Sequence, residues 1–351
     1  MTFRYIGSKA RLVDALTPHL TRPGRAGRFV DLFCGTGVVA ETALRLGMPV
    51  VLNDTLVCAV TMAAGRLVSH AQVPFEKLGG YRAAISLLNE APPVPGVLWR
   101  QYSPASASHC GIERRYFTEE NAARLDAMRQ RVGTWHRDGV LNEAENTLLI
   151  ADLLSATNRV ANIAGTYGCF LSRWQKQALN PVLAQERELR ATAPRVEVFN
   201  VDAYDVEVHA ADVVYLDPPY TKRQYAAYYH ILETVALNDD PAVEGVAGLR
   251  PWRSKASPFC YKRKALDAMV RLVEGLAANT VLISYSGEGH MDLNDLVHRL
   301  GETGVAELVP LSDVGRYRPN RTSSENGTVV TEYLIKFLRR AQAQREERRV
   351  A

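Results

Sequence analysis

The sequence has few of the features that mark several classes of protein. Its 351 residues include five cysteines, at positions 34, 58, 110, 169 and 260, with no Cys-x-x-Cys pair and no Cys/His cluster. We therefore expect no disulfide framework, no metal site and a reducing compartment. No apolar run approaches the roughly 18 residues of a membrane helix, and the first 20 residues are polar and interrupted by Gly7 and Pro18. These absences predict a cytoplasmic protein without a membrane partner.

A strong charge of either sign is also missing. The chain has 42 Lys and Arg against 38 Asp and Glu, a formal net charge of +4. This balance permits a locally basic surface for an anionic polymer but does not require one. With 47% hydrophobic and 23% charged residues, the chain resembles an ordinary globular protein with room for one large domain or two.

A glycine-containing turn follows the first apolar stretch. Residues 28–33 are mostly apolar and are followed by Gly35-Thr36-Gly37 and by a helical pattern over residues 38–46. This order predicts a buried strand, a turn where the backbone can approach a ligand, and a helix. The turn lacks the third glycine of the dinucleotide pattern and the Gly-Lys-Ser/Thr of a phosphate loop, which argues against NAD and ATP. Tight turns also use glycine for conformation alone.

Acidic residues follow two further predicted strands. Residues 49–52 lead into Asn53 and Asp54, and Asp54 lies 17 residues after Gly37. An acid at this place in a doubly wound α/β fold binds the hydroxyl groups of a ribose. The strand predicted over residues 196–201 leads to Asp202, a possible acceptor for an adenine amino group. Together these patterns predict a doubly wound sheet that binds a nucleoside without phosphates.

The stretch Asp217-Pro218-Pro219-Tyr220 follows an apolar run over residues 213–216. The prolines end the predicted strand because they donate no ladder hydrogen bond, and they fix the residue before each of them in an extended conformation. The Asp217 carboxylate and the Pro218 carbonyl then form a pair of fixed acceptors, suited to the amino group of a flipped base that stacks on Tyr220. A capped strand leading into a turn would fit these four residues equally well.

Residues 65–193 interrupt the alternation of strands and helices. A helix is predicted over residues 122–132 after a Thr118 cap, and another over residues 142–160. Residues 165–176 mix aromatic, polar and basic side chains in a predicted loop or hairpin. We interpret residues 65–193 as an inserted helical domain, either a partner-binding domain or a plain helical cap.

Aromatic and basic clusters occupy the last third of the chain. Tyr225, Tyr228 and Tyr229 suit either base stacking or helix packing, and the basic loops at 250–255, 261–264 and 316–321 suit either phosphate contact or simple solvation. Residues 280–286 predict a further strand, and residues 329–338 predict an edge strand that closes the sheet. The charged tail, residues 339–351, receives no role.

Four motifs in order resemble the D12 class of adenine-specific DNA methyltransferases, the Dam-like family. They are the run from Phe3 to Lys9, the run Asp31-Leu32-Phe33-Cys34-Gly35-Thr36-Gly37, the pair Asn53-Asp54 and, after the long insert, Asp217-Pro218-Pro219-Tyr220. The resemblance spans residue 2 to about residue 337 and is looser over the insert. Tyr5-Ile6-Gly7-Ser8-Lys9 departs from the best-known members, which carry tryptophan and two glycines there, so the chain resembles a different subgroup.

The resemblance implies a fold, a cofactor and a set of site residues. The fold is a Rossmann-like, S-adenosylmethionine-dependent methyltransferase sheet with helices on both faces, in residues 1–64 and 194–338, with a mainly helical target-recognition domain inserted at residues 65–193. The cofactor is S-adenosylmethionine. Its implied contacts are Tyr5, Lys9, Asp31, Phe33, Gly35, Gly37, Asp54, Asp202 and Asp217. The implied catalytic residues are Asp217, Pro218, Pro219 and Tyr220.

The implied reaction is methyl transfer to N6 of a flipped-out adenine in double-stranded DNA. Such an enzyme would act in restriction-modification, with a cognate restriction endonuclease as a possible partner, or as an orphan methylase. Two alternatives stay open: an adenine-N6 methyltransferase that acts on RNA, and a DNA-binding relative without catalysis. Transfer to cytosine N4 fits less well, because those enzymes more often carry serine in place of Asp217. The sequence indicates neither a recognition site nor an oligomeric state.

Overall fold

The computed structural model describes residues 5–7, 9–20, 27–192, 195–315 and 329–340, without the side chains of residues 312–315, 329 and 330. Phe3, Arg4 and Ser8 of the first motif, the basic cluster at 316–321 and the tail beyond residue 340 lie outside the described residues. The chain forms two compact units. A helical unit comprises Met1–Ile6, Leu56–Pro194 and Tyr225–Lys255, and a sheet unit comprises Gly7–Thr55, Arg195–Gln224 and Ala256–Ala351.

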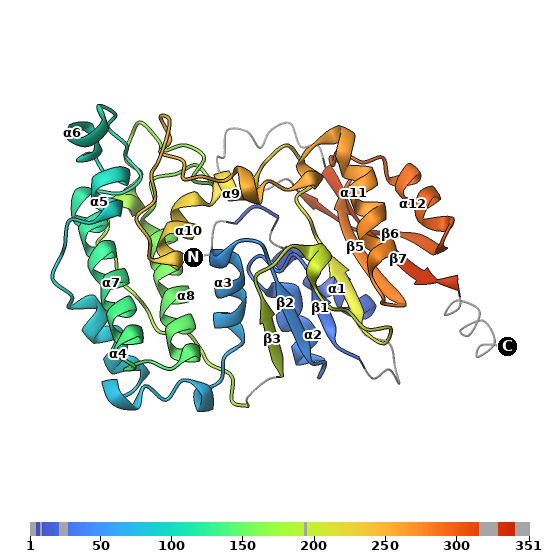
Figure 1. Ribbon diagram of the computed structural model, residues 1–351, viewed down its shortest axis with the longest axis horizontal. Helices are drawn as coiled ribbons and strands as arrows, with labels where there is room; N and C mark the ends of the chain where they lie inside the picture. The colour runs from blue at the N-terminus through green and yellow to red at the C-terminus, as the bar shows by residue number, and fades with distance from the viewer. Residues whose placement is uncertain (1–4, 8, 21–26, 193–194, 316–328, 341–351) are drawn as a thin grey trace. The chain divides into compact units, whose positions relative to one another are not determined.

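The sheet unit is built on seven strands in the order β3-β2-β1-β4-β5-β7-β6 (Figure 1). The strands are β1 (Phe29–Asp31), β2 (Val50–Asn53), β3 (Val196–Phe199), β4 (Val213–Leu216), β5 (Thr280–Ser286), β6 (Gly304–Gly315) and β7 (Val329–Arg339). The first five pair in parallel, and β7 runs antiparallel to both of its neighbours. The order reverses between β1 and β4, which creates the switch point where doubly wound sheets bind ligands. The predicted Rossmann-like sheet is confirmed.

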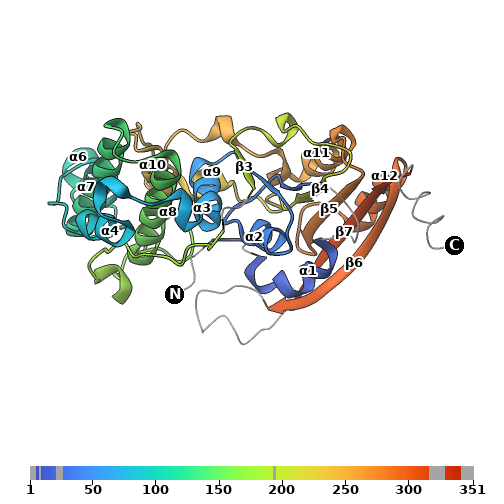
Figure 2. The same cartoon turned by 90° about the horizontal axis from the view of Figure 1, so that it is seen from below.

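Helices cover both faces of this sheet, as Figure 2 shows: α1 (Val13–Leu20) and α2 (Val38–Arg45) lie on one side, and α11 (Lys262–Gly275) and α12 (Leu293–Gly301) on the other. One core joins Val30, Val214 and Ile283 of the sheet to Met269 of α11 and Leu296 of α12, all with at most 3% of their surface exposed. Short 3-10 helices complete the unit: Lys9–Arg11 (η1), Ala203–Asp205 (η5) and Pro258–Cys260 (η7). Apolar burial on both faces explains the unbroken apolar runs of the central strands.

Three expectations about this unit need correction. Strand β7 is not an edge strand, because β6 pairs with it along its outer side. The sequence analysis missed β6, in which Pro310 and a register shift before Asp313 interrupt the strand pattern. The basic run at 261–264 is no loop, since Lys262 begins helix α11.

The helical unit contains eight α-helices among its described residues. They are α3 (Val57–Leu67), α4 (Tyr81–Asn89), α5 (Val97–Tyr102), α6 (Ser106–Cys110), α7 (Glu119–Arg137), α8 (Glu143–Val160), α9 (Tyr225–Tyr228) and α10 (His230–Leu237). Four 3-10 helices accompany them: η2 (His70–Gln72), η3 (Glu76–Leu78), η4 (Lys176–Leu179) and η6 (Arg253–Lys255). Thr118 caps α7 as predicted, and Asn142 caps α8 in a capping box with Glu145. Residues 165–175 form an irregular loop rather than a hairpin.

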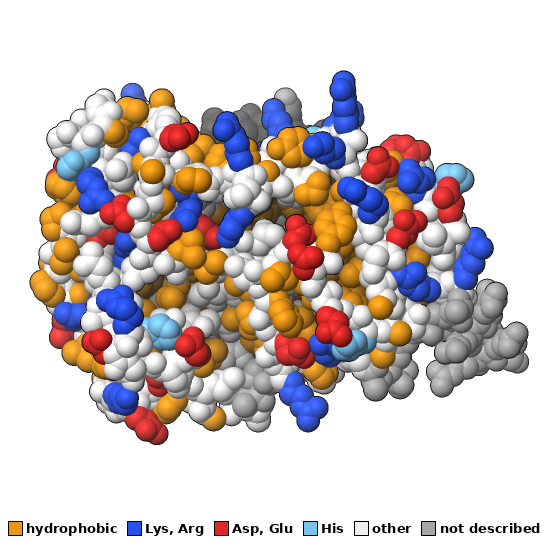
Figure 3. Space-filling view, viewed as in Figure 1, with side chains coloured by type: hydrophobic (Ala, Val, Ile, Leu, Met, Phe, Trp, Pro, Cys, Tyr) orange, Lys and Arg blue, Asp and Glu red, His pale blue; other side chains and the backbone are white. Residues whose placement is uncertain are grey.

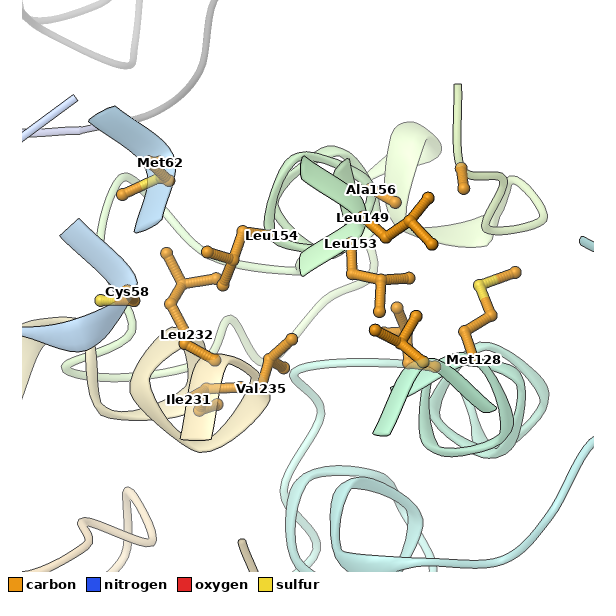
Figure 4. Packing of buried hydrophobic residues seen from close by; sticks show 14 of the residues in the cluster. Cys58, Met62, Met128, Leu149, Leu153, Leu154, Ala156, Ile231, Leu232 and Val235 are labelled. Carbon is orange, nitrogen blue, oxygen red and sulfur yellow. The ribbon is translucent and has the colours of Figure 1, made fainter. Parts of the chain in front are cut away.

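The core of the helical unit draws on segments far apart in sequence. Figure 4 shows Leu154 of α8 pointing toward Met62 of α3 and Leu232 of α10, with Met128 of α7 on the far side of α8. Buried Glu233 of α10 accepts hydrogen bonds from the backbone nitrogens of Val57 (3.1 Å) and Cys58 (2.9 Å), which begin α3. Polar and apolar contacts therefore tie residues 225–255 to the helices of 56–194.

The compact units do not coincide with the domain limits expected from sequence. The helical unit starts at Leu56 rather than at residue 65 and includes Tyr225–Lys255, which the sequence analysis placed in the catalytic part. On the face seen in Figure 3, Lys and Arg side chains are interspersed with Asp and Glu, in keeping with the small net charge. None of the described helices combines the length and the apolar character needed to cross a membrane.

Candidate active site

The candidate site lies in the sheet unit, at the carboxyl ends of β1, β2 and β4. Strand β1 lies between the other two, and Asp31, its last residue, is in register with Leu52 of β2 and Tyr215 of β4. Two residues beyond those partners come Asp54 and Asp217. Because parallel strands end at the same edge, the topology brings three acidic side chains together. Each was predicted from sequence as a site residue.

The glycine turn is tied to the end of β2. Gly35 and Gly37 have φ angles of 49° and 75°, in the left-handed region that glycine tolerates, and Gly37 precedes the first residue of α2. The Gly35 nitrogen donates to Asp54 Oδ2 at 3.1 Å, and the Cys34 nitrogen donates to the Asn53 carbonyl at 2.9 Å. Asp54 thus helps to fix the backbone of the turn, a role that sequence reasoning did not foresee.

One carboxyl oxygen of Asp31 receives no hydrogen bond from the residues that the structure describes. This oxygen is Oδ1, and the Asp31 side chain is 2% exposed. Burial, and then the negative charges of Asp217 and Asp54, raise the pKa of Asp31 well above its usual value. A buried acceptor of this kind is costly unless a ligand supplies the donor. A positively charged donor would fit best.

Asp217 belongs to a buried cluster with Lys9 and Glu332. Lys9 Nζ lies 3.2 Å from Asp217 Oδ1 and 3.1 Å from Glu332 Oε2, and the Lys9 side chain is 4% exposed. Burial raises the pKa of Asp217 to about 6, against the opposing effect of Lys9 and with the help of Glu332. Burial alone would lower the pKa of Lys9, but Asp217 and Glu332 raise it, so the ammonium stays charged. The site therefore holds a carboxylate that ionises near neutral pH.

Tyr220 is held at three points. Its ring meets that of Tyr285 edge-on, with centroids 5.5 Å apart, and Lys9 Nζ lies 5.2 Å from its centroid. Its carbonyl accepts a hydrogen bond of 2.9 Å from the His290 nitrogen. Burial raises the pKa of Tyr220 to about 12, so the phenol is neutral. Pro218 is buried and Pro219 half-buried between this ring and Asp217, so the four predicted catalytic residues form one rigid turn.

The remaining predicted contacts are more scattered. Half-buried Phe33 lies edge-on to Phe259, with centroids 5.5 Å apart. Asp202 comes three residues after β3 ends, is exposed, and accepts from the Tyr204 nitrogen at 3.1 Å as the cap of η5. Tyr5 belongs to the helical unit, where its ring stacks on Tyr229 with centroids 4.4 Å apart. The structure therefore groups Lys9, Asp31, Asp54 and Asp217 more firmly than Tyr5 and Asp202.

The tyrosines at 225–229 and the basic residues at 250–255 have structural contacts. Tyr229 is fully buried, and its hydroxyl accepts from the Ile6 nitrogen, while the Tyr225 hydroxyl donates to the Ile6 carbonyl at 3.1 Å. Arg250 pairs with Asp239 at 2.7 Å, and Lys255 pairs with Glu233 at 2.8 Å. These contacts favour helix packing and ion pairing over base stacking and phosphate contact.

Sequence reasoning missed Glu332 entirely. This residue lies on β7, opposite Ser286 at the end of β5. The only available signal was an acidic side chain within an otherwise apolar stretch, which strand patterns alone assign to the solvent side. Among the described residues, no group of three or more His, Cys, Asp or Glu side chains has the arrangement of a metal site.

The strand order and the glycine turn define a Rossmann-like fold, in which the Asp-Pro-Pro-Tyr turn follows the central strand β4. The chain belongs to the D12 class N6 adenine-specific DNA methyltransferase family, whose model matches residues 5–297. The family predicted from the four motifs is thereby confirmed.

Named methyltransferases are similar to this chain over most of its length. The Type II methyltransferase M.FokI of Planomicrobium okeanokoites is 33% identical over 340 residues, which cover 95% of this chain and 52% of that protein. The modification methylase StsI of Streptococcus sanguinis is 32% identical over 89% of this chain and 48% of its own length. The chain thus spans about half the length of these two relatives.

A third relative is matched over nearly its whole length. The Type II methyltransferase M.NlaIII of Neisseria lactamica is 29% identical over 92% of this chain and 94% of its own length. A solved structure, a SAM dependent methyltransferase from Agrobacterium tumefaciens, matches 96% of this chain and 63% of that chain with 10% identity and a TM-score of 0.31, a likeness too weak to support a conclusion.

Proposed function

We propose that this protein transfers a methyl group from S-adenosylmethionine to N6 of an adenine in double-stranded DNA. The observation that carries the proposal is the position of Asp217. It follows the central strand β4 beside Asp31, and Pro218, Pro219 and Tyr220 follow it in a rigid turn. Membership of the D12 family supports the adenine, the DNA and the cofactor.

The site residues fit the cofactor. The buried Oδ1 of Asp31, which lacks a donor among the described residues, is a matching acceptor for the ammonium of the methionine end. Gly35 and Gly37 allow the backbone to approach that end, and Phe33 lines it. Asp54 would hold the ribose, Asp202 the adenine, and Lys9 a further wall of the pocket. When bound, S-adenosylmethionine supplies an electrophilic methyl group on its sulfonium.

The Asp-Pro-Pro-Tyr turn would prepare the adenine for attack. The N6 lone pair is delocalised into the ring, so the amino group is a poor nucleophile until its geometry changes. Hydrogen bonds from N6 to Asp217 and to the Pro218 carbonyl would draw the nitrogen toward a tetrahedral shape. The half-buried ring of Tyr220 would stack on the flipped base and align N6 with the methyl group.

Methyl transfer to DNA and to RNA separates this proposal from its nearest rivals. With tritiated S-adenosylmethionine, duplex DNA of mixed sequence is expected to accept label, while RNA of the same sequence accepts little. Preferential labelling of RNA would favour the RNA alternative. Cofactor binding in calorimetry without transfer to any nucleic acid would favour a relative without catalysis.

The helical unit is proposed to recognise the DNA target. Its residues 65–193 correspond to the insert that the family resemblance assigns to target recognition. The Type II names of M.FokI and M.NlaIII support a role in restriction-modification, with a cognate restriction endonuclease as partner. An orphan methylase without such a partner would use the same unit for the same purpose.

Methyl transfer is expected to fall at acidic pH. Asp217, whose pKa is about 6, accepts the amine hydrogen bond best when it is ionised. Because the pKa is raised, protonation begins near neutral pH and increases as the pH falls. The single-turnover rate should be flat above about pH 7 and should fall roughly tenfold per unit below pH 6. A rate that stays constant down to pH 5 would contradict this role for the carboxylate.

Cofactor binding is expected to release protons. Burial and neighbouring acids raise the pKa of Asp31, and a bound ammonium would lower it again. The binding enthalpy, measured over a range of pH in buffers of different ionisation enthalpy, should report net release of protons. Asp31→Asn should weaken binding and remove most of this release. Equal enthalpies in all buffers would show that Asp31 does not receive the cation.

A further inference from the structure

Glu332 is an acidic residue next to the candidate site that neither the sequence motifs nor the family resemblance marked. It lies on β7 with a side chain that is 13% exposed, and its Oε2 accepts a hydrogen bond of 3.1 Å from Lys9 Nζ. Its strand partner is Ser286, the last residue of β5, and β5 pairs with β4, which leads to Asp217. Because β7 pairs antiparallel with β5, Glu332 becomes the second acidic side chain in contact with Lys9.

Lys9 is shared between two carboxylates rather than paired with one. Its ammonium lies 3.2 Å from Asp217 Oδ1 and 3.1 Å from Glu332 Oε2. The ammonium contact to Asp217 is with Oδ1, which is buried and has no hydrogen-bond partner of suitable geometry among the described residues. Glu332 thus limits how far the ammonium can move onto Asp217.

We propose that Glu332 is a positioning residue that anchors Lys9, so that Asp217 keeps one oxygen available for the amino group of the target base. This inference rests on the proposed function of Asp217. Without Glu332, the ammonium would move toward Asp217 and engage both of its oxygens. The acceptor would then be occupied by the protein's own cation.

The titratable groups that face Asp217 come from several elements. They are Lys9 of η1, Asp31 of β1, Tyr215 of β4, Tyr220 after β4 and Glu332 of β7. Lys9 is the one cation in this set, and burial keeps both phenols neutral. Glu332 raises the pKa of Asp217, whereas Lys9 lowers it. Loss of the Glu332 charge therefore shifts the Asp217 titration to lower pH.

A titration of Asp217 tests this arrangement without any reaction. The full chain is labelled with ¹³C-carboxyl aspartate, and the Asp217 signal is assigned by its loss in Asp217→Asn. Glu332→Gln, which removes the charge but keeps an acceptor for Lys9, should lower the midpoint from about 6 by roughly half to one pH unit. Glu307→Gln is the matched control, because Glu307 pairs with Lys336 at 3.8 Å on the neighbouring strand and is 65% exposed. It should leave the midpoint unchanged.

Kinetics then separates positioning from binding. Glu332→Gln should lower kcat about threefold to tenfold, and Glu332→Ala, which also removes the acceptor, should lower it further. The KM for cofactor should stay within about twofold in both variants, since Asp31, Gly35 and Gly37, which are proposed to hold the methionine end, are unchanged. Glu307→Gln should match the wild-type protein in both constants.

The outcomes are distinguishable from failure of the proposed function. If the wild-type protein methylates no DNA, the function is wrong, yet the titration still reports the Lys9 arrangement. An unchanged Asp217 midpoint in Glu332→Gln would overturn the positioning role, and so would a higher KM at constant kcat. Unfolding of both Glu332 variants in thermal melts would assign Glu332 to stability and would also overturn it.

Discussion

Asp217→Ala is expected to lower methyl transfer about a thousandfold or more. The substitution removes the acceptor that is proposed to shape the target amine, and the transfer step would depend on such preorganised groups. Asp217→Asn should also lose most activity, because its amide nitrogen presents hydrogens toward the amine. The measurement is single-turnover transfer of tritiated methyl groups to duplex DNA at pH 8.

The fold should survive this substitution. Lys9 keeps Glu332 as a partner at 3.1 Å, so no buried cation is left alone. The raised pKa of Asp217 means that its ionised form is less favourable in the folded chain than in the unfolded chain at neutral pH, so its removal is not a loss of stabilising charge. The melting temperature should therefore change little.

Asp267→Ala provides the matched control. Asp267 lies on α11 in the same unit, its side chain is 67% exposed, and it pairs with Arg299 at 3.4 Å. Its loss should leave transfer unchanged. Methylation of DNA by Asp217→Ala at a rate near that of Asp267→Ala would exclude Asp217 from the reaction.

Exchange of the helical unit is expected to change the DNA sequence that is methylated. The exchange must include both Leu56–Pro194 and Tyr225–Lys255, because these two segments belong, together with Met1–Ile6, to one compact unit. M.NlaIII of Neisseria lactamica is a suitable donor, since the match covers 94% of that protein. Sequencing of modified adenines in host DNA should then report the donor's site. An unchanged site would place recognition elsewhere.

Exchange of residues 56–194 alone is expected to prevent folding. Glu233 of α10 accepts from the backbone nitrogens of Val57 and Cys58, and it would lose both donors if the exchanged α3 began at a different place. The Thr234 carbonyl, which accepts from Arg129 of α7 at 2.9 Å, would lose this donor if the new segment carries no arginine there. Buried groups left without partners cost about 1–3 kcal/mol each, and more when charged. If the chimera with one exchanged segment is insoluble and the chimera with both is soluble, the result would support the conclusion that the two segments fold as one unit.

Local patterns predicted most of the sheet. Strands β1, β2, β4 and β5 appeared in the sequence as short apolar runs with clear stops, and β5 matches its predicted residues. Helix α8, Glu143–Val160, matches the helix predicted over residues 142–160 closely. These elements were predictable because burial on both faces and capping leave local signals.

Contacts between distant segments were not predictable in the same way. Nothing local to Tyr225–Lys255 indicates that it packs with the helices of 56–194. Strand β6 was missed because Pro310 and a register shift weaken its pattern. The role of Glu332 depends on β7 returning antiparallel beside β5, and only the assembled sheet brings it to Lys9.

Nucleoside analysis of methylated DNA tests the central claim most directly. Duplex DNA is incubated with the wild-type protein and S-adenosylmethionine, digested to nucleosides and examined by mass spectrometry. We predict N6-methyldeoxyadenosine as the product with the wild-type protein and with Asp267→Ala, and none with Asp217→Ala. N4-methyldeoxycytidine, or no methylated nucleoside at all, would contradict the account.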